Sequence, residues 1–415
     1  MNILPPSDLI LPYVQVPRSM VREPGQFGGH QDQDCIRGDL VIQGGIVRRM
    51  QAASGQAQAG HVVMPKLTEC HVHLDKCHTI SRMGEVGGDL QAAIAAQSED
   101  RETWTTDDIR ERATRGLEEL IRAGCGTVRS HVDWSHGKDA TSPTPAWHVL
   151  SELAQDHQGK VDLQVAPLVG ADDLALPGVA DEIGRLIAKS GSVLGVFVLD
   201  QPNRQAGMLA AFRVAEKYGL ALDFHVDEGL DPNLDGLGMI ARTAIETGFQ
   251  GPVLCGHACS LMNLQGDPLK TLVETLVSSG LTIASLPTSN LYLQGRTSGT
   301  PDRRGLTRIR ELRSAGVPVV IGTDNVRDAF CPLGRHDPRH TLALAALAAH
   351  LDPPFGDYFP MITTSAESAL GLAPTFVDGA AIGDLLLFDA TSTSDLLAGA
   401  DAPQSLSDAL IGELS

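Results

Sequence analysis

Short runs of Val, Leu and Ile alternate with longer amphipathic stretches between residues 67 and 352. Apolar runs of this length that close on Gly, Asp or Asn predict β-strands. The predicted strands cover residues 67–75, 126–134, 161–170, 193–200, 221–229, 251–258, 281–290 and 317–325. The stretches between them predict helices. Within residues 303–316, for example, Leu306, Ile309 and Leu312 recur every three residues and Gly316 closes the pattern.

Strand and helix pairs in this succession predict an α/β fold, a (β/α)8 barrel of the TIM type. A doubly wound open sheet would give a similar alternation, so the pattern alone leaves it open. The polar residues favour the barrel, because barrel enzymes build their active sites at the carboxyl ends of the strands. Nearly every predicted strand carries such residues, in order His71 and His73, His131 and Asp133, Gln164, Asp200, His225 with Glu228, His257, Asn290, and Asp324.

The two flanks of the barrel region carry short strand patterns of their own. Residues 39–43 read Asp-Leu-Val-Ile-Gln before a Gly-Gly pair, and residues 380–390 contain Leu-Leu-Leu-Phe. Neither flank is able to bury a core alone. We therefore expect residues 1–64 and 366–415 to form one small β subdomain beside a catalytic barrel of residues 65–365.

The composition narrows the class of partner. The 415 residues include 51 Asp and Glu against 32 Lys and Arg, a formal net charge of −19, which argues against binding to nucleic acid or anionic membranes. No apolar run is long enough to span a bilayer, and the first positive charge is Arg18, so no basic start of a secretory signal is expected. Seven scattered cysteines do not resemble a disulfide framework. We expect a cytoplasmic protein with reduced thiols that acts on a small molecule; a homo-oligomer is compatible with the sequence.

His71 and His73 stand two residues apart on one predicted strand, so their imidazoles project from the same face. His225 and Asp324 close two other strands, which would bring four nitrogen and oxygen donors into one barrel mouth. Such a set suits zinc or iron(II). His131 and Asp133 would support the metal ligands or serve only strand packing, and the sequence leaves both interpretations open.

Two further positions have competing interpretations. A structural zinc site is one interpretation of the segment that contains Cys255, His257 and Cys259, but no second Cys/His pair at ligand spacing follows. We therefore expect His257 to face the barrel mouth and the two cysteines to fill the core. Glu228 follows His225 by three residues, where a proton shuttle is needed beside a metal. Asp227 is the alternative carboxylate, and an exposed loop position is the alternative location.

The chain resembles the metal-dependent amidohydrolase superfamily, and within it the cytosine deaminase branch, through motifs that follow one another across most of the barrel. These motifs are His-Val-His-Leu-Asp-Lys (71–76), His-Val-Asp (131–133), Asp-Leu-Gln (162–164), Phe-His-Val-Asp-Glu (224–228), Gly-His (256–257), Leu-Gln-Gly-Arg (293–296), Arg-Arg-Gly-Leu-Thr-Arg (303–308) and Gly-Thr-Asp (322–324).

The resemblance implies a role for each matching residue. It implies that His71, His73, His225 and Asp324 bind the metal and that Glu228, His257 and Asp324 act in catalysis. It also implies that Gln164 reads the edge of the substrate base and that Phe330 packs against it. Members with two metals need a carbamylated Lys after the fourth strand, and here no Lys lies between Lys189 and Lys217. We therefore expect one divalent ion, zinc or iron(II), per chain, which weakens a dihydroorotase or hydantoinase interpretation.

The reaction that the resemblance implies is hydrolytic deamination of a cytosine-like heterocycle. The ion would acidify a bound water held by Asp324 and His257, the resulting hydroxide would attack the amidine carbon, and Glu228 would carry protons to the ring nitrogen and the leaving ammonia. The cytosine enzymes have His-Asp-Asp where this chain has Thr323-Asp324-Asn325, and Trp where it has Phe330. We expect Asn325 to contact the substrate and to change its preference.

Two other functions stay open. The Asp-Asn pair followed by Val-Arg-Asp is closer to the triazine hydrolases that release isopropylamine from N-isopropylammelide, although those enzymes lack the glutamate that Glu228 represents. Release of an alkylamine from an azine ring is therefore the first alternative to deamination. A catalytically silent metal-binding scaffold is the second alternative, and the intact set of chemical positions argues against it.

Overall fold

A computed structural model describes residues 8–54, 60–84, 86–134, 139–191 and 193–413. Its larger sheet holds eight parallel strands that follow one another in chain order. They are β6 (Leu67–Val72), β7 (Cys125–Asp133), β8 (Asp162–Gly170), β9 (Leu194–Val198), β10 (Leu222–Val226), β11 (Val253–His257), β12 (Thr282–Ser285) and β13 (Val319–Ile321). A parallel bridge between Val72 and Asp324 joins the first strand to the end of the last. The (β/α)8 barrel is confirmed, and the open sheet is wrong.

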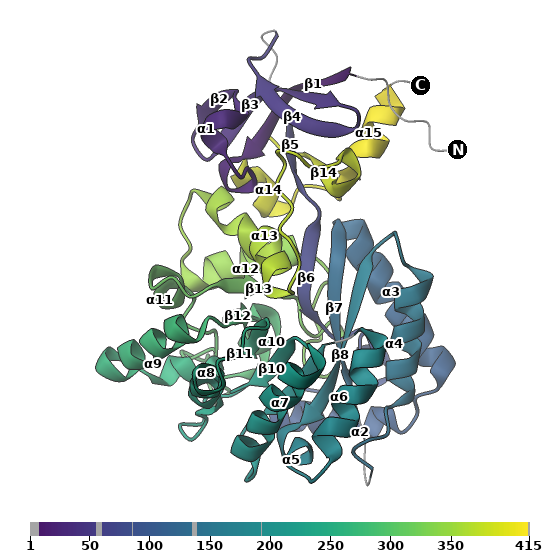
Figure 1. Cartoon of the computed structure of the whole chain (residues 1–415), viewed down its shortest axis with the longest axis vertical. Helices are drawn as coiled ribbons and strands as arrows, with labels where there is room; N and C mark the ends of the chain where they lie inside the picture. The colour runs from purple at the N-terminus through teal and green to yellow at the C-terminus, as the bar shows by residue number, and fades with distance from the viewer. Residues whose placement is uncertain (1–7, 55–59, 85, 135–138, 192, 414–415) are drawn as a thin grey trace.

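Helices cover the outside of the barrel (Figure 1). The longer ones are α3 (Thr106–Ala123), α4 (Pro145–Asp156), α6 (Val179–Ser190), α7 (Arg204–Tyr218), α8 (Gly236–Thr247), α9 (Gly266–Ser279) and α12 (Pro338–Ala349). In α3, the Thr105 side chain caps the first turn by accepting from the Asp108 amide, and the helix ends at Gly124 with φ of 101°. Its inner face buries Ile109, Leu117 and other apolar side chains, as an amphipathic helix on a sheet must.

Further helices, most of them shorter, lie in the connections. They are α2 (Leu90–Arg101), α5 (Ala171–Leu174), α10 (Pro287–Leu293), α11 (Ile309–Ser314) and α13 (Thr364–Ala369), with 3₁₀ turns η2 (Ile80–Arg82), η3 (Cys259–Asn263) and η4 (Phe355–Ile362). Two predicted boundaries are wrong here. The strand predicted over 281–290 ends at Ser285, because Pro287 begins a helix, and Asn290 therefore lies in α10. A helix was predicted over residues 303–316, but the structure has only α11 within this range. Gly305 takes a left-handed conformation with φ of 72°, which interrupts the predicted helix.

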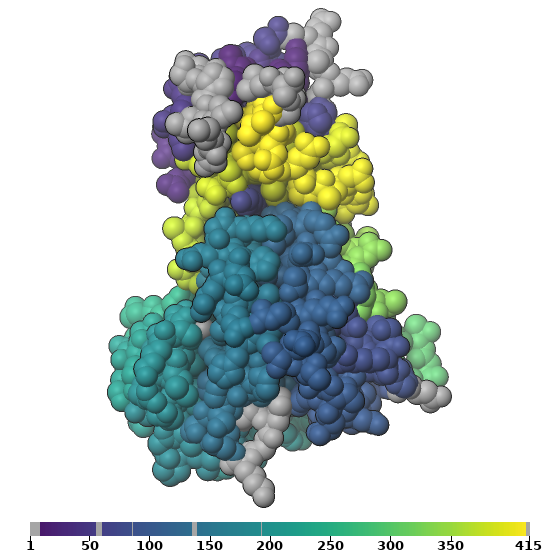
Figure 2. All heavy atoms as spheres, turned by 90° about the vertical axis from the view of Figure 1, so that its right-hand side faces the viewer, coloured from purple at the N-terminus to yellow at the C-terminus, as the bar shows by residue number. Residues whose placement is uncertain are grey.

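The smaller sheet combines both ends of the chain. Its strands are β1 (Asp8–Pro17), β2 (His30–Asp32), β3 (Cys35–Gln43), β4 (Ile46–Gln51), β5 (His61–Pro65), β14 (Leu385–Asp389) and β15 (Gln404–Ser405), with α1 (Pro24–Phe27), η1 (Arg18–Met20), η5 (Ile382–Asp384), α14 (Thr393–Gly399) and α15 (Leu406–Glu413) around it. β5 pairs with β14 over five residues. The C-terminal segment, yellow in Figure 2, lies between the N-terminal strands and the barrel. The predicted β subdomain from both chain ends is confirmed.

Helix α13 packs against barrel strands beside the amino end of the barrel. Ala366, Ala369 and Leu370 pack in one apolar cluster with Cys70, Leu254, Ala284, Leu286 and Val320. The predicted domain boundary at residue 365 therefore falls inside a helix that belongs to the barrel, and the chain returns to the smaller sheet only at β14. Most of the predicted site residues lie at the opposite, carboxyl end of the strands, which we call the mouth. Within the described ranges, no helix is long and apolar enough to cross a bilayer.

Candidate active site

Four side chains converge at the carboxyl ends of the barrel strands. Nε2 of His73 lies 3.1 Å from Nε2 of His225 and 3.3 Å from Oδ1 of Asp324. Nε2 of His71 lies 3.6 Å from the same Asp324 oxygen. All four side chains are buried. The structure thus brings together the four residues that the sequence predicts as metal ligands.

The chemistry of this cluster fits a divalent cation. Both ring nitrogens of His71 and both carboxylate oxygens of Asp324 are buried with no hydrogen-bond partner in the described part of the chain. Burial first, and then the neighbouring histidines, lowers the pKa of His71 and of His225 well below the usual value, so both rings are neutral near pH 7. Neutral imidazoles packed against one carboxylate are the form of this donor set that binds zinc or iron(II).

His131 joins the same cluster. One ring nitrogen each from His71, His73, His131 and His225 lie within 4.8 Å of one another. The ring of His131 stands 4.1 Å from that of His71, centroid to centroid. Its Nε2 lies 3.2 Å from Asp223. His131 therefore lies against the proposed ligands and also against Asp223, and its role as a support for the metal ligands stays a prediction.

Glu228 and His257 face each other in the mouth, with 3.6 Å between Oε2 and Nε2. Burial, and then the charge of Asp324, raises the pKa of Glu228 well above its usual range. Nδ2 of Asn290 lies 3.0 Å from Nδ1 of His257. With the amide donating, the imidazole proton sits on Nε2, on the side of Glu228.

Asp227 faces away from the mouth. Its carboxylate accepts hydrogen bonds from the Gly236 and Leu237 amides and from the Ser260 hydroxyl. These contacts tie the end of β10 to the start of α8. The alternative in which Asp227 replaces Glu228 as the proton shuttle is therefore wrong, since the Asp227 carboxylate is committed to this structural role.

Strained backbone marks the same strand ends. His257, Asp227 and Asp324 adopt φ values of 71°, 52° and 59°, in the left-handed region that non-glycine residues seldom enter. Such conformations cluster at functional sites, where the surrounding structure holds a side chain in an otherwise unfavourable direction. Here they turn His257 and Asp324 at the ends of their strands.

The mouth opens into a cavity of about 240 Å³. Its wall consists of His73, His225, Glu228, His257, Asn325 and Phe330 near the cluster, Lys76, Asp133, Leu168, Gly170 and Phe197 from the other strand ends, and Leu90, Ile94, Gln97, Ser98 and Arg101 from α2. This volume is smaller than the roughly 300–1,000 Å³ of pockets for drug-sized ligands. The cavity therefore suits a small ring system.

Asp133 lies on the rim of this cavity as the centre of an ion-pair group. Nζ of Lys76 lies 3.2 Å from Oδ1 of Asp133, and Arg101 contacts the other oxygen. Lys76 also lies over the Phe330 ring, 5.4 Å from its centroid. Asp133 thus links α2 to β7 and the loop after β6, and it contacts Lys76 rather than the histidine cluster.

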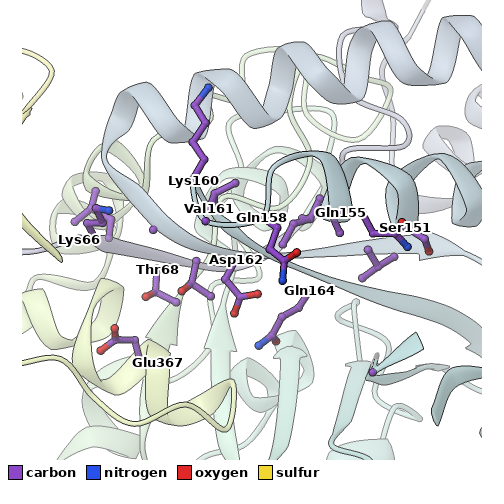
Figure 3. Close-up of a pocket in the computed structure, with 18 of the residues that line it drawn as sticks. Lys66, Thr68, Ser151, Gln155, Gln158, Lys160, Val161, Asp162, Gln164 and Glu367 are labelled. Atoms are coloured by element: carbon purple, nitrogen blue, oxygen red, sulfur yellow. The ribbon is translucent and has the colours of Figure 1, made fainter. Parts of the chain in front are cut away.

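Gln164 does not lie in the mouth. It stands near the start of β8, level with Arg129, and its Oε1 accepts from the Arg129 guanidinium. It lines a separate cavity of about 980 Å³ at the amino end of the barrel, together with Lys66, Thr68 and Asp162 (Figure 3). The prediction that Gln164 reads the substrate is wrong, because residues that contact the mouth come four or more positions later on this strand.

Leu168 occupies the mouth position on β8 instead, and Asp200 is exposed after β9. Asn325 and Phe330 do line the mouth cavity. The Nδ2 group of Asn325 already donates to Asp328 at 2.6 Å, so one face of this amide is engaged within the protein. Contact of Asn325 and Phe330 with a substrate stays a prediction.

The cysteines take no part in the site. All seven are buried and free. Burial raises the pKa of Cys255 and of Cys259 well above the usual value, and among the described residues neither belongs to a group of converging metal ligands. The structural zinc alternative at Cys255, His257 and Cys259 is therefore wrong.

Gln97 is a buried residue in the wall of the mouth cavity that was not predicted from the sequence. A signal was present: Leu90, Ala93, Ile94 and Gln97 follow the helical spacing of one apolar stripe, and a polar residue on such a stripe faces an interior.

Comparison with known proteins identifies the family. The model of the amidohydrolase family matches residues 90–375. The chain belongs to the amidohydrolase family. Pterin deaminase of Rhizobium rhizogenes is 31% identical to this amidohydrolase over 383 residues, which cover 89% of this chain and 86% of the relative. The predicted family and its deaminase branch are confirmed.

Two further relatives bear on the alternatives. The structure of 5-methylcytosine deaminase from Klebsiella pneumoniae, liganded with 5-fluorocytosine, superposes with a TM-score of 0.77 at 26% identity and covers 95% of this amidohydrolase and 96% of that chain. N-isopropylammelide isopropyl amidohydrolase of Pseudomonas sp. strain ADP is 22% identical over 330 residues, 76% of this chain and 77% of the relative. The relatives thus include both reaction types considered from the sequence.

Proposed function

We propose that this amidohydrolase is a hydrolytic deaminase of a small nitrogen heterocycle that carries an amino group beside a lactam, with a pterin as the first candidate substrate. The observation that carries the proposal is Glu228, a buried carboxyl group whose Oε2 lies 3.6 Å from Nε2 of His257, in the same mouth as the histidine cluster. Release of ammonia from an amidine requires proton delivery at this place.

The identity of the ring is proposed from two supports. The pterin deaminase relative is the more similar of the two curated relatives, at 31% identity against 22%. Gln164, which the resemblance to the cytosine enzymes implied would read the base, lies at the other end of the barrel. A cytosine-like pyrimidine is therefore the second candidate.

Each residue has a role that its surroundings favour. His71, His73, His225 and Asp324 would hold one divalent ion, zinc or iron(II), which would supply an acidified water as the nucleophile. Glu228 would accept the proton that this water loses and donate it to the ring nitrogen next to the amino-bearing carbon. It would then accept the remaining proton of the added hydroxyl group and pass it to the departing amine.

His257 presents its Nε2 proton toward the same carbon, where it stabilises the oxygen on which negative charge develops. In the overall reaction, the C–NH₂ bond breaks, the oxygen of the water becomes the new ring carbonyl, and ammonia leaves. The ring keeps its oxidation state, so the reaction needs no redox cofactor.

The test is a panel of pterin, isocytosine, cytosine, 5-methylcytosine and N-isopropylammelide, assayed separately for ammonia and for isopropylamine. We expect ammonia from pterin at the highest kcat/KM. Release of isopropylamine with no ammonia from any member would replace the proposal by the alkylamine reaction.

A further inference from the structure

Gln97 lies in the wall of the mouth cavity with an amide that has no partner. Its side chain is 1% exposed. Neither Nε2 nor Oε1 has a hydrogen-bond partner in the part of the chain that the structure describes. The same cavity contains Glu228, His225 and His257. A buried amide of this kind is costly to leave unsatisfied, so a ligand in the cavity is its natural partner.

The helix that carries Gln97 holds it over the mouth. Leu90 and Ala93 of α2 pack in a small apolar cluster with Leu293 and Ala329, and Ile94 and Phe330 border that cluster. Gln97 follows Ile94 by three residues and Ala93 by four, so it lies on the same face of the helix. The wall that α2 contributes to the mouth thus combines apolar Leu90 and Ile94 with polar residues, of which Gln97 is the buried one.

The chemistry of the amide defines the ligand group. A glutamine side chain offers one N–H donor and one C=O acceptor next to each other. Their complement is a lactam, whose ring C=O and N–H are also adjacent. Leu168, the mouth residue of β8, offers neither group. We propose that Gln97 of α2 recognises the lactam edge of the substrate and sets the specificity of the enzyme. The inference rests on the proposed function for the identity of the ring.

The charges next to Gln97 favour a neutral ligand at this edge. Arg101, one turn further along α2, contacts Asp133, which also contacts Lys76. Burial lowers the pKa of Lys76, but Asp133 and Asp75 outweigh it, so the pKa is raised and Lys76 stays charged within this group. Because Lys76 and Arg101 both pair with the Asp133 carboxylate, their charges are balanced within the wall. Gln97 is then the neutral hydrogen-bonding group beside them.

The experiment compares wild type with Gln97→Met, which keeps the length of the side chain and removes both polar groups. Gln91→Met is the matched control, because Gln91 lies exposed on the same helix. Gln97→Glu is the second variant; it keeps the shape and loses the N–H donor. For each protein, kcat and KM are measured with pterin and with 2-aminopteridine, which lacks the lactam, and the Kd of the lactam lumazine is measured by calorimetry.

We expect Gln97→Met to raise KM for pterin and Kd for lumazine by about 10-fold or more, with a smaller change in kcat and no change for 2-aminopteridine. Gln97→Glu should weaken lumazine in the same direction, and Gln91→Met should match wild type. Equal losses with pterin and 2-aminopteridine, or an unchanged Kd for lumazine, would overturn the inference, as would a wild type that binds no lactam. Lumazine binding that depends on Gln97, without ammonia from any ring, would support the inference and contradict the proposed function.

Discussion

Oδ1 of Asp223 lies 3.2 Å from Nε2 of His131, and both side chains are completely inaccessible to solvent. The other oxygen of Asp223 accepts from Arg129 at 2.9 Å. Burial would raise the pKa of Asp223, but His131 and Arg129 outweigh it and lower the pKa, so the carboxylate is charged. The pair therefore connects the polar floor of the barrel to the histidine cluster and fixes the direction of the His131 ring.

Replacement of Asp223 should weaken metal binding without removing a proposed ligand. In Asp223→Asn the partner of His131 loses its charge, and the ring is free to reorient beside His71. Groups that contact metal ligands directly contribute on the order of 10–100-fold in metal affinity; because Asp223 acts through His131, we expect a loss of about 10-fold. Competition with a chelator measures it. Asp181→Asn, at an exposed ion pair with Lys217, is the control; equal affinity in both variants would contradict this role.

Metal content gives the second prediction. We expect one divalent ion per chain, because four donors converge and the sequence has no Lys between Lys189 and Lys217. Elemental analysis of reconstituted protein should give this ratio, and the double variant His71→Ala, His73→Ala should lose the ion. Two ions per active chain would refute the mononuclear site, and a full ion content in the double variant would refute the ligand assignment.

Glu228→Gln gives the third prediction. The amide keeps the shape of the carboxyl group but does not transfer protons, so kcat should fall by about 100-fold or more while metal content stays at the wild-type level. The matched variant Asp227→Asn removes a charged acceptor of three hydrogen bonds at the start of α8. It should lower thermal stability and leave the ratio of kcat to bound metal nearly unchanged. The reverse pattern would make Asp227 the proton shuttle.

The sequence predicted most of the architecture because strand alternation and strand-end chemistry are local signals. His71, His73, His225 and Asp324 were found by two-residue spacing and by their positions at strand ends, and the structure brings them together. Gln164 was assigned wrongly because its role was taken from the resemblance, although the predicted strand 161–170 already places it near the amino end. Gln164 lies near the start of β8 and Leu168 near its end, and only the second position reaches the mouth.

Other features depend on contacts that no local pattern contains. The Asp227 carboxylate accepts hydrogen bonds from the Gly236 amide and the Ser260 hydroxyl. These bonds form only because β10 packs against α8 and η3. The packing of α13 on the barrel depends on contacts between residues 366–370 and strands that lie about 50 to 300 positions earlier.

Gly256→Ala gives the fourth prediction. A Cβ at this position would lie 2.9 Å from Cε1 and 3.1 Å from Nδ1 of His71, which is closer than side chains pack. The ring of His71 would have to move, so we expect weaker metal binding and at least a tenfold loss of kcat/KM, with the secondary structure unchanged. Gly299→Ala is the control, because no atom lies within 4 Å of its Cβ position. A fully active Gly256→Ala would mean that His71 tolerates displacement.

The fifth prediction concerns stability against acid at a second cluster, away from the mouth. Oε2 of Glu119 lies 2.9 Å from Nδ1 of His336 and 3.3 Å from Nε2 of His78. Burial raises the pKa of Glu119, but hydrogen bonds from both histidines outweigh it and hold the pKa well below the usual range. Burial lowers the pKa of His336 more than Glu119 raises it.

Both shifts make the protein less stable in acid. Because His336 has a lowered pKa in the folded state, the unfolded chain binds more protons as the pH falls below about 6.5, and stability declines. Glu119 stabilises the folded state above its unfolded pKa of about 4.3, and this contribution is lost as the pH falls further toward its folded pKa. We therefore expect the free energy of unfolding to fall in two successive ranges below neutral pH.

Glu119→Gln separates the two contributions. At pH 7 the variant should be less stable by about 1.5–3 kcal/mol, since it loses hydrogen bonds to a charged acceptor. The difference between wild type and variant should shrink below about pH 4.3, where the wild-type carboxylate begins to protonate. Denaturant unfolding at a series of pH values measures this difference, in which changes at the metal site common to both proteins cancel. A difference that does not vary with pH would show that Glu119 acts through packing rather than through its charge.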